Sequence, residues 1–360
     1  MTKKIRVGVL AGGASAERQI SLASGMGILE HLDPARYDVV MLDPLALMSD
    51  NPALTDEQRA LARRLAGAAE ALPARDQELP SAMQDQMHRA SAALVPATGA
   101  LLPGGQADRI DVAFIALHGP WGEDGKLQGL LETLGIPYTG SGVLSSALAM
   151  DKAMAKTVLA ANGLDVPEGE IVTSATDVPS IAPPSVVKPV ENGSSVGVTM
   201  VDDAADYPTA IAEALRFDRR ALVEERIAGR ELTVGVIGLD ELEALPVIEI
   251  VSKRTFFDYR AKYDPSASEE LCPAPIPDEI AAHARSIAIR AHKALGCSGI
   301  SRADLMWDGT RMVVLEVNTM PGMTPNSLVP KAAKVAGIGY GELVDRLIGW
   351  ALAGREPRRR

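Results

Sequence analysis

Short apolar runs separated by polar or amphipathic stretches mark the first part of the chain. Residues 5–10 are apolar apart from Arg6 and are followed by a glycine pair, and residues 15–31 then show a helical pattern. Further apolar runs at 39–42 and 111–117 predict two more strands. A strand, a glycine turn, a helix and another strand are typical of an α/β domain with a parallel sheet.

The second half of the chain has a different pattern, in which pairs of short strands flank turns. Glycine, serine and aspartate separate the members of each pair, as they do in hairpins. Such pairs predict antiparallel sheets. The expected elements are strands at 185–189 paired with 196–201, 221–227 with 231–237, and 299–306 with 311–317, a strand at 245–251, and helices at 143–161, 278–295 and 339–354.

Composition restricts the class of partner more than the fold. At 360 residues the chain is long enough for two or three domains. Its net charge of −11 disfavours nucleic acid and membrane as partners. Two cysteines, Cys272 and Cys297, are too few for a disulfide framework. Because there is no signal-peptide pattern and no apolar stretch near the ~20 residues of a membrane span, we expect a cytoplasmic protein.

Four polar residues interrupt two otherwise apolar strands near the end of the chain. Arg302 and Asp304 alternate along one strand, and Glu316 and Asn318 alternate along the next. Side chains two positions apart share a face of a sheet, so the four groups should converge. Carboxylate and amide oxygens suit Mg²⁺, which keeps waters and shares substrate phosphates. The alternative is a solvated sheet face with arginine–carboxylate pairs, which the apolar neighbours disfavour.

A lysine beside a glycine-rich turn forms a candidate phosphate site. Lys188 ends a predicted strand, and the run Gly193-Ser194-Ser195-Val196-Gly197 follows it. Glycines let backbone N–H groups approach a phosphate closely. The same run matches the nucleophile elbow of α/β-hydrolases, with His118-Gly119 as a candidate oxyanion loop. The elbow requires a helix after its serine, whereas the β-branched residues here predict a strand, which disfavours the hydrolase.

Two further stretches place polar groups beside apolar ones. Glu224 and Glu225 lie on a predicted strand, with Glu231 just after it, where carboxylates could read an adenine amino group and ribose hydroxyls. An edge strand with outward charges would look the same. The loop 252–272 contains four aromatic residues within positions 255–263, in a chain that is only 4% aromatic. Loops of this kind often close over ligands, so we predict a mobile lid.

Taken together, these motifs resemble the D-alanine–D-alanine ligase family of the ATP-grasp superfamily. The matching stretches follow one another in family order from about residue 5 to residue 330. They are GGASAERQISLASG (12–25), LHGPWGEDGKLQGLLETLGIPYTGSG (117–142), MDK (150–152), VKPVENGSSVGV (187–198), VEERIAGRELTV (223–234), FFDYRAKY (256–263) and SRADLMWDGTRMVVLEVNTMPGMTPNSLVP (301–330).

The resemblance implies an ATP-grasp fold of mixed α/β (α+β) class, with ATP clasped between two antiparallel sheets. Its implied domains are 1–140, an N-terminal α/β substrate domain with 51–108 as a helical elaboration, 141–222, a central ATP-grasp domain, and 223–360, a C-terminal ATP-grasp domain with the metal and substrate sites. The implied reaction joins two D-alanines at the expense of ATP through an acyl phosphate, for peptidoglycan precursor synthesis. Two Mg²⁺ ions, for which Mn²⁺ can substitute, and a homodimer are also implied.

The resemblance implies a nucleotide and metal site made from both sheets. The residues expected to bind ATP are Lys152, Lys188, Ser194, Ser195 and Lys262 at the phosphates, Glu224, Glu225 and Ile227 at the adenine, Glu231 at the ribose, and Met306 and Leu315 on the ring faces. The residues expected to bind the metal ions are Asp304, Glu316 and Asn318.

The resemblance also implies a site for the two amino acids. Its expected residues are Glu17 at the first ammonium, His118 beside the first substrate, Arg302 and the Gly322 N–H at the tetrahedral oxyanion, Ser327 at the second carboxylate, and Tyr263 bonded to Ser194 as a latch.

Two alternative functions stay open at this point. One is another ATP-grasp carboxylate–amine ligase with a different acceptor, and the other is a non-catalytic ATP-binding or regulatory protein. Four retained residues argue against the non-catalytic protein: Lys188, Arg302, Asp304 and Glu316. By analogy with the family, the Lys262-Tyr263 pair favours D-alanine over D-lactate as acceptor. Phe257, where tyrosine is frequent, departs from the pattern.

Overall fold

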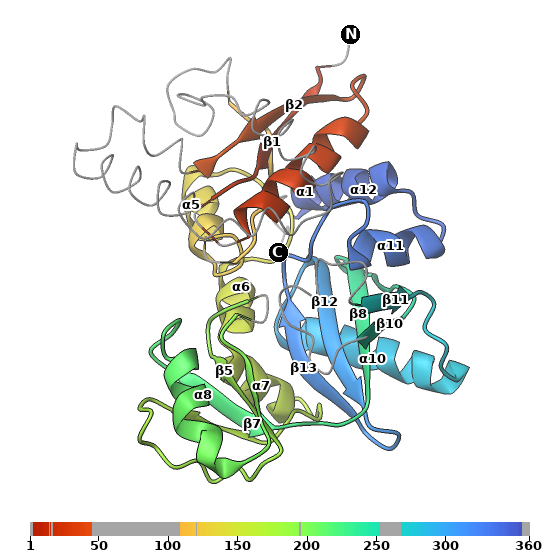
Figure 1. The fold of residues 1–360 in the computed structure, drawn as a ribbon. Coiled ribbons are helices and arrows are strands. Elements are labelled where there is room, and N and C mark those ends of the chain that lie inside the picture. Colours follow the sequence, from red (N-terminus) through yellow and green to blue (C-terminus); the bar gives the residue numbers. More distant parts are fainter. Residues whose placement is uncertain are drawn as a thin grey trace, which may run out of the picture.

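The described part of the chain folds into three sheets with helices packed against them, as the computed structural model in Figure 1 shows. The structure describes residues 3–13, 15, 17–44, 109–119, 121–193, 196–252 and 268–354. Within these residues, no helix is long and apolar enough to cross a membrane.

The first sheet is parallel and confirms the pattern at the start of the chain. Its order is β2-β1-β3, formed by β1 (Ile5–Leu10), β2 (Tyr37–Leu42) and β3 (Val112–Ile115). Helix α1 (Arg18–His31) connects β1 to β2 and begins three residues later than expected. Residues 20–28 of α1 are all buried, because the helix packs on β1 and β2 and beside the last helix of the chain.

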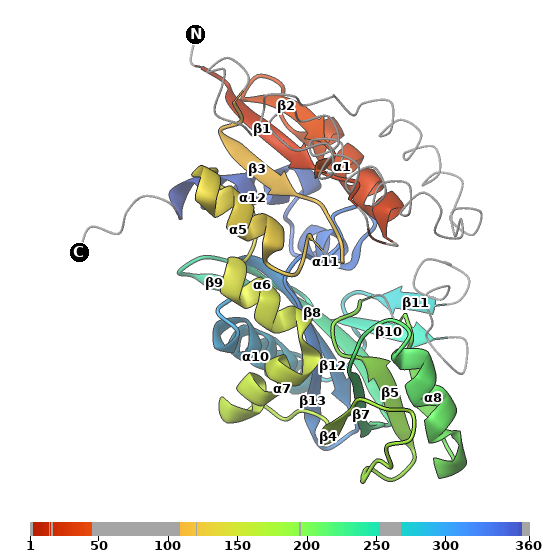
Figure 2. The same ribbon diagram turned by 90° about the vertical axis from the view of Figure 1, so that its left-hand side faces the viewer.

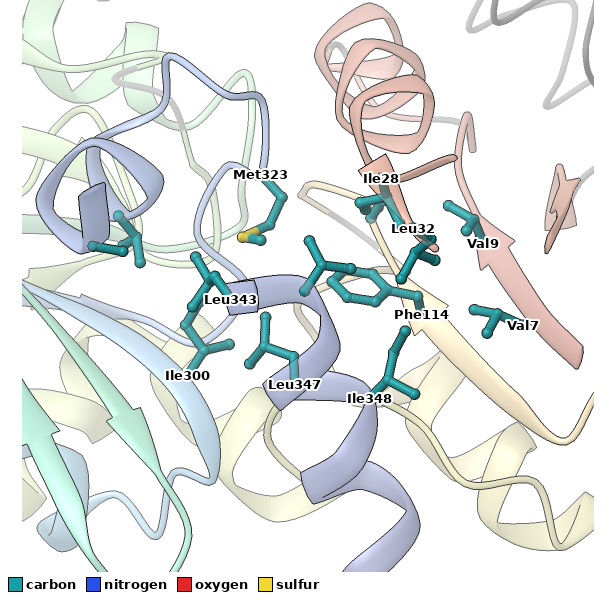
Figure 3. Close-up of a cluster of buried hydrophobic side chains, with 14 of the residues drawn as sticks. Val7, Val9, Ile28, Leu32, Phe114, Ile300, Met323, Leu343, Leu347 and Ile348 are labelled. Atoms are coloured by element: carbon teal, nitrogen blue, oxygen red, sulfur yellow. The ribbon is translucent and has the colours of Figure 1, made fainter. Parts of the chain in front are cut away.

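The last helix of the chain packs against the first sheet and α1 as well as against the helix before it. Helix α12 (Tyr340–Ala353) lies beside α1 in Figures 1 and 2, and α11 (Leu328–Val335) packs against α12. One hydrophobic cluster joins Val7, Ile28 and Phe114 to Leu343 and Leu347, as Figure 3 shows. Burial of this shared apolar surface holds the N-terminal sheet to the C-terminal part of the chain.

The second sheet is antiparallel and has a separate core. Its order is β4-β7-β5-β6, and its inner face packs on helix α8. The elements are β4 (Gly169–Val172), β5 (Ser185–Pro189), β6 (Thr199–Val201), the short 3₁₀ helix η2 (Ala204–Asp206), α8 (Tyr207–Ala214) and β7 (Ala221–Glu225).

The third sheet is antiparallel and contains the predicted terminal hairpin. Its order is β11-β10-β8-β12-β13, with β9 paired to β8, and helix α10 contacts β8, β9, β12 and β13. The elements are β8 (Arg230–Gly238), β9 (Leu242–Ala244), β10 (Ile248–Ser252), β11 (Ser268–Leu271), α10 (Asp278–Ala294), β12 (Gly299–Trp307) and β13 (Met312–Asn318).

Three helices link the first sheet to the second: α5 (Lys126–Leu134), α6 (Val143–Met150) and α7 (Lys152–Ala161). The single helix expected over 143–161 is wrong, because the backbone breaks at Asp151. The Asp151 side chain accepts a hydrogen bond from Met154 N at 2.9 Å and so caps α7. The break turns Lys152 toward the loop that follows β5, since its backbone N–H bonds Val190 O.

The expected pairing of 221–227 with 231–237 is also wrong. β7 pairs with β4 and β5, whereas β8 pairs with β9, β10 and β12 in the other sheet. The connection between them crosses from one sheet to the other. A Cβ on Gly229 would lie 2.3 Å from the carbonyl oxygen of Trp307, so only glycine allows this close passage.

The strand expected at 196–201 is reduced to the three residues of β6. Residues 196 and 197 form a turn instead, and Gly197 has a φ of 75°, in the left-handed region that a strand does not use. The described residues directly after the glycine-rich run, 198–201, contain no helix, which is the element that the rejected hydrolase motif required.

Candidate active site

The polar residues of the terminal hairpin lie opposite each other, as the two-residue period predicted. Asp304 on β12 pairs in register with Glu316 on β13, and Arg302 pairs with Asn318. On the other side of β12, Thr233 of β8 is opposite Asp304 and donates a hydrogen bond from Oγ1 to Asp304 Oδ1 at 2.6 Å. The structure therefore brings the predicted metal ligands together on one hairpin.

The pairing of β12 with β13 contains a β-bulge, next to Asp304 and Leu305 of β12, and the bulge turns Leu315 and Glu316 of β13 away from the core. Leu305 pairs with Val314, which leaves Leu315 as the extra residue of the bulged strand. Val314 and Val317 both belong to the core cluster, although a regular strand would turn residues three apart to opposite faces. Leu315 and Glu316 between them are half-buried and lie outside that cluster.

Arg302 and Asp304 form a bidentate pair within one strand. Arg302 donates from Nε to Oδ1 at 2.9 Å and from Nη2 to Oδ2 at 2.7 Å. Burial lowers the pKa of Arg302, but Asp304, Glu316 and Glu123 raise it by more, so the net pKa lies above the ordinary value of arginine. A permanent, nearly buried cation therefore stands beside the acidic hairpin.

Lys152 is held where the glycine-rich loop meets the hairpin. Its Nζ donates to Asn192 O at 2.5 Å and lies 3.7 Å from Glu316 Oε2. Arg220 connects the start of α7 to the loop after β5, because its Nη2 lies 2.8 Å from Asp151 Oδ2 and 2.6 Å from Glu191 Oε1. The predicted phosphate-binding lysine is thus next to a predicted metal ligand, as a site for a charged phosphate requires.

Lys188 and Glu224, which were expected to bind different parts of ATP, are in direct contact with each other. Lys188 on β5 donates a short hydrogen bond to Glu224 Oε1, and Lys156 Nζ lies 2.9 Å from Glu224 Oε2. Burial raises the pKa of Glu224, but the two ammonium groups lower it by more. Burial lowers the pKa of Lys156 to about 8, against the opposing effect of Glu224.

The remaining predicted nucleotide residues lie along the strands that border this charged row. Glu231 of β8 pairs in register with Met306 of β12, so the predicted ribose and adenine contacts are neighbours on one face. Ile227 is nearly buried. The Glu225 carboxylate accepts from Arg311 Nη2 at 3.1 Å and from Glu168 N at 3.1 Å, so any contact of Glu225 with adenine would use its backbone.

Glu17 and His118 lie together at the N-terminal side of the site. Glu17 Oε2 lies 3.7 Å from the Cβ that would be built on Gly119 and 3.8 Å from that on Gly193. His118 is buried, with Nδ1 3.6 Å from Glu123 Oε1 and Nε2 3.5 Å from Ser24 Oγ. The start of α1, the loop after β3 and the glycine-rich loop after β5 therefore meet at Glu17.

Gly322 and Ser327 lie together on the opposite side. A Cβ on Gly322 would be 2.9 Å from Ser327 Oγ. Ser327 is the N-cap of α11 but makes no side-chain capping bond, and its hydroxyl bonds Thr324 N and Oγ1 instead. The Ser327 hydroxyl thus leaves the N–H groups of Leu328 and Val329, in the first turn of α11, without a side-chain cap, and such groups can donate to a carboxylate.

Four predicted site residues, Ser194, Ser195, Lys262 and Tyr263, lie outside the described residues, as does most of the predicted lid 252–272. Two residues that the sequence pattern does not single out, Lys156 and Thr233, contact predicted ligands. Lys156 had one usable signal, since it lies four residues after Lys152 and therefore on the same face of a helix.

Two family models match the chain. The model of the D-ala D-ala ligase N-terminus matches residues 6–141, and that of the D-ala D-ala ligase C-terminus matches residues 168–349. The D-alanine–D-alanine ligase of Syntrophobacter fumaroxidans is 41% identical, over 98% of this chain and 99% of that protein. That of Paramagnetospirillum magneticum is 43% identical, over 95% of this chain and 97% of that protein.

Solved structures of the same class share the fold. The D-alanine–D-alanine ligase of Bacillus anthracis, complexed with ATP, is 30% identical with a TM-score of 0.71, and covers 98% of this chain and 99% of its own. The VanG D-Ala:D-Ser ligase of Enterococcus faecalis is 28% identical with a TM-score of 0.76, over 97% and 100% of the two chains. The predicted fold class and enzyme class are confirmed, and the chain belongs to the D-alanine–D-alanine ligase family.

Proposed function

We propose that the protein uses ATP to join two D-alanines into D-alanyl-D-alanine, a precursor for peptidoglycan synthesis, with ADP and phosphate as the other products. The observation that carries the proposal is the terminal hairpin. There Asp304 and Glu316 pair in register, Arg302 lies beside them, and Lys152 Nζ is 3.7 Å from Glu316 Oε2. Carboxylates flanked by fixed cations are the arrangement that phosphoryl transfer between anionic groups requires.

Two Mg²⁺ ions, or Mn²⁺ in their place, would be held by Asp304, Glu316 and Asn318. Their oxygen donors fit a hard cation. Asn318 Oδ1 accepts a hydrogen bond from Met320 N at 2.7 Å, which fixes the amide and leaves a second lone pair on the oxygen. Among the described residues, no three histidine, cysteine or carboxylate side chains form a metal site by themselves, so substrate phosphates would complete the ligand shell. When bound, the ions neutralise charge on the phosphates.

The first step would activate one substrate. Glu17 binds the ammonium of the first D-alanine, and His118 lies beside it. The carboxylate oxygen of that D-alanine attacks the γ-phosphorus of ATP and the bond to the bridging oxygen breaks, which releases ADP and leaves an acyl phosphate. Lys152 and Lys188 offset the phosphate charge, so this step depends on positioning more than on a covalent nucleophile of the protein.

The second step would form the peptide bond. The carboxylate of the second D-alanine binds at Ser327 and the N-terminus of α11, where the side-chain cap is lacking. Its amine attacks the acyl carbon and loses a proton, and the carbon–oxygen bond to phosphate then breaks. Arg302 and the Gly322 N–H stabilise the oxyanion that forms between these events.

The segment 252–272 would close over this intermediate. Lys262 would contact the γ-phosphate and Tyr263 would bond Ser194, which would exclude water from the acyl phosphate. We also propose domain boundaries at 140/141 and 222/223. We further propose that the protein is a homodimer, which sedimentation equilibrium would test.

The direct experiment measures phosphate release from Mg²⁺–ATP with D-alanine, L-alanine, D-serine and D-lactate, and identifies each product by mass spectrometry. D-alanine alone should give phosphate and the dipeptide in equal amounts. Activity with D-alanine only when another acceptor is present would indicate a ligase of different specificity, such as the D-Ala:D-Ser type. Binding of ATP without turnover of any substrate would indicate a non-catalytic protein.

A further inference from the structure

Three charged side chains form a buried row between α7 and the central sheet. Lys156 comes from α7, Lys188 from β5 and Glu224 from β7, and each is at most 8% exposed. Glu224 lies in the middle, with Oε1 bonded to Lys188 and Oε2 2.9 Å from Lys156 Nζ. The Lys156 contact has the distance of an ion pair but not the angles of a hydrogen bond.

The row carries two positive charges and one negative charge. With only Lys188 and Glu224 the row would be neutral, and a phosphate approaching Lys188 would also meet the opposing field of Glu224. Lys156 supplies the second positive charge and takes the oxygen that Lys188 does not use. Burying a lysine is costly, because the free-energy cost of removing its ammonium group from water can exceed the Coulombic gain from a single ion pair. A buried lysine that is kept at such a position therefore suggests a role for its charge.

We propose that Lys156 is a positioning residue of the ATP site: it holds Glu224 as an oriented carboxylate and leaves Lys188 as a net cation for the nucleotide. This inference rests on the proposed function, since it assumes that ATP binds beside Lys188. Lys156 would act without touching the nucleotide, through Glu224 and Lys188.

The competing explanation is that Lys156 merely fills space between α7 and the sheet. Its neighbour Ala155 and the nearby Leu159 do belong to the core. A space-filling role predicts that Lys156→Met, which keeps the length of the side chain, costs little in nucleotide affinity. A positioning role predicts a selective loss of affinity that a second cation at the same position partly restores.

The experiment compares the full-length wild type with Lys156→Met, Lys156→Arg and, as a matched surface control on α10, Lys293→Met. ADP binding with Mg²⁺ is measured by isothermal titration calorimetry, and KM is measured separately for ATP and for D-alanine. Lys156→Met should weaken ADP binding and raise KM for ATP at least about tenfold, the scale for loss of one partner in a buried charge pair. KM for D-alanine should change less than about twofold, Lys156→Arg should recover part of the loss, and Lys293→Met should match the wild type.

A double-mutant cycle with Glu224→Gln tests whether Lys156 acts through Glu224. In the Glu224→Gln background, Lys156→Met should change ADP affinity less than about twofold, because the carboxylate that it orients is gone. Equal losses in both backgrounds, or no loss in either, would overturn the proposal. If Lys156→Met alone does not fold, Lys156→Gln, a neutral side chain that can still donate a hydrogen bond to Glu224, takes its place in both backgrounds, with the same expected and contradicting outcomes. Absence of ADP binding by the wild type would contradict the proposed function instead.

Discussion

Arg302 donates two hydrogen bonds, at 2.9 and 2.7 Å, to the carboxylate of Asp304, which lies two positions further along the same strand. The fork holds the carboxylate that is proposed to bind metal and keeps a permanent positive charge within the site. A guanidinium can make both bonds at once, whereas an ammonium is a point charge. The pair therefore joins two proposed functions, metal binding and oxyanion stabilisation, in one rigid contact.

Arg302→Lys is expected to lower kcat by about a hundredfold or more, the scale found when an oxyanion-stabilising donor is lost. The charge is kept but the fork and its geometry are lost. Steady-state assays of the dipeptide give kcat and KM, with Arg285→Lys on the exposed side of α10 as the control. A kcat within about twofold of the wild type would remove Arg302 from the chemistry.

Glu316→Gln is expected to abolish most activity while the protein stays folded. The amide keeps the size of the side chain but removes the negative charge opposite Asp304, and metal stabilisation is worth several kcal/mol. The measurement is phosphate release over a range of Mg²⁺ concentrations, with the melting temperature taken alongside and Glu279→Gln as an exposed control. Near-normal turnover at millimolar Mg²⁺ would show that Glu316 is not a metal ligand.

Tyr263→Phe is expected to raise the use of D-lactate relative to D-alanine near neutral pH. A phenol that is ionised or hydrogen-bonded favours an incoming amine over a neutral hydroxyl acid, and Tyr263 lies in the proposed lid. Competition between the two acceptors, with both products quantified by mass spectrometry, gives the ratio directly. Tyr259→Phe, in the same segment, serves as the matched control. An unchanged product ratio would rule out a role of Tyr263 in selectivity.

His292 is expected to make the fold sensitive to acid. Its ring is buried, Nδ1 lies 2.7 Å from Ser301 Oγ, and burial lowers its pKa to about 4 from an ordinary value of 6.5. Between these two pH values the unfolded chain binds more protons than the folded one, so stability falls as the pH is lowered from 6.5 toward 4.

The measurement for His292 is urea unfolding at pH 7.5 and pH 5. The wild type should lose about 2 kcal/mol more between these pH values than His292→Gln, which cannot titrate. His283→Gln, at an exposed position of the same helix, should follow the wild type. Equal pH dependence in the wild type and His292→Gln would mean that His292 is not the group that titrates.

Local patterns predicted a large part of the fold and of the site. Several elements begin and end within about one residue of their expected bounds: β1, α10 and the two strands of the terminal hairpin, β12 and β13. Arg302, Asp304, Glu316 and Asn318 were placed together because residue alternation along a strand is a local property. The helix break at Asp151 is not visible in the sequence pattern, because helical periodicity continues on both sides of it and only the capping contact with Met154 reveals the break.

The sequence by itself determined the family, the two-residue alternation on β12 and β13, and the glycine-rich approach to a phosphate. Tertiary structure alone decided that β7 and β8 lie in different sheets, that α12 completes the core around Phe114, and that Lys156 shares Glu224 with Lys188. Those contacts join residues far apart in the chain. Their partners are chosen by burial and by charge pairing in the folded molecule, which a local pattern of apolar and polar residues does not record.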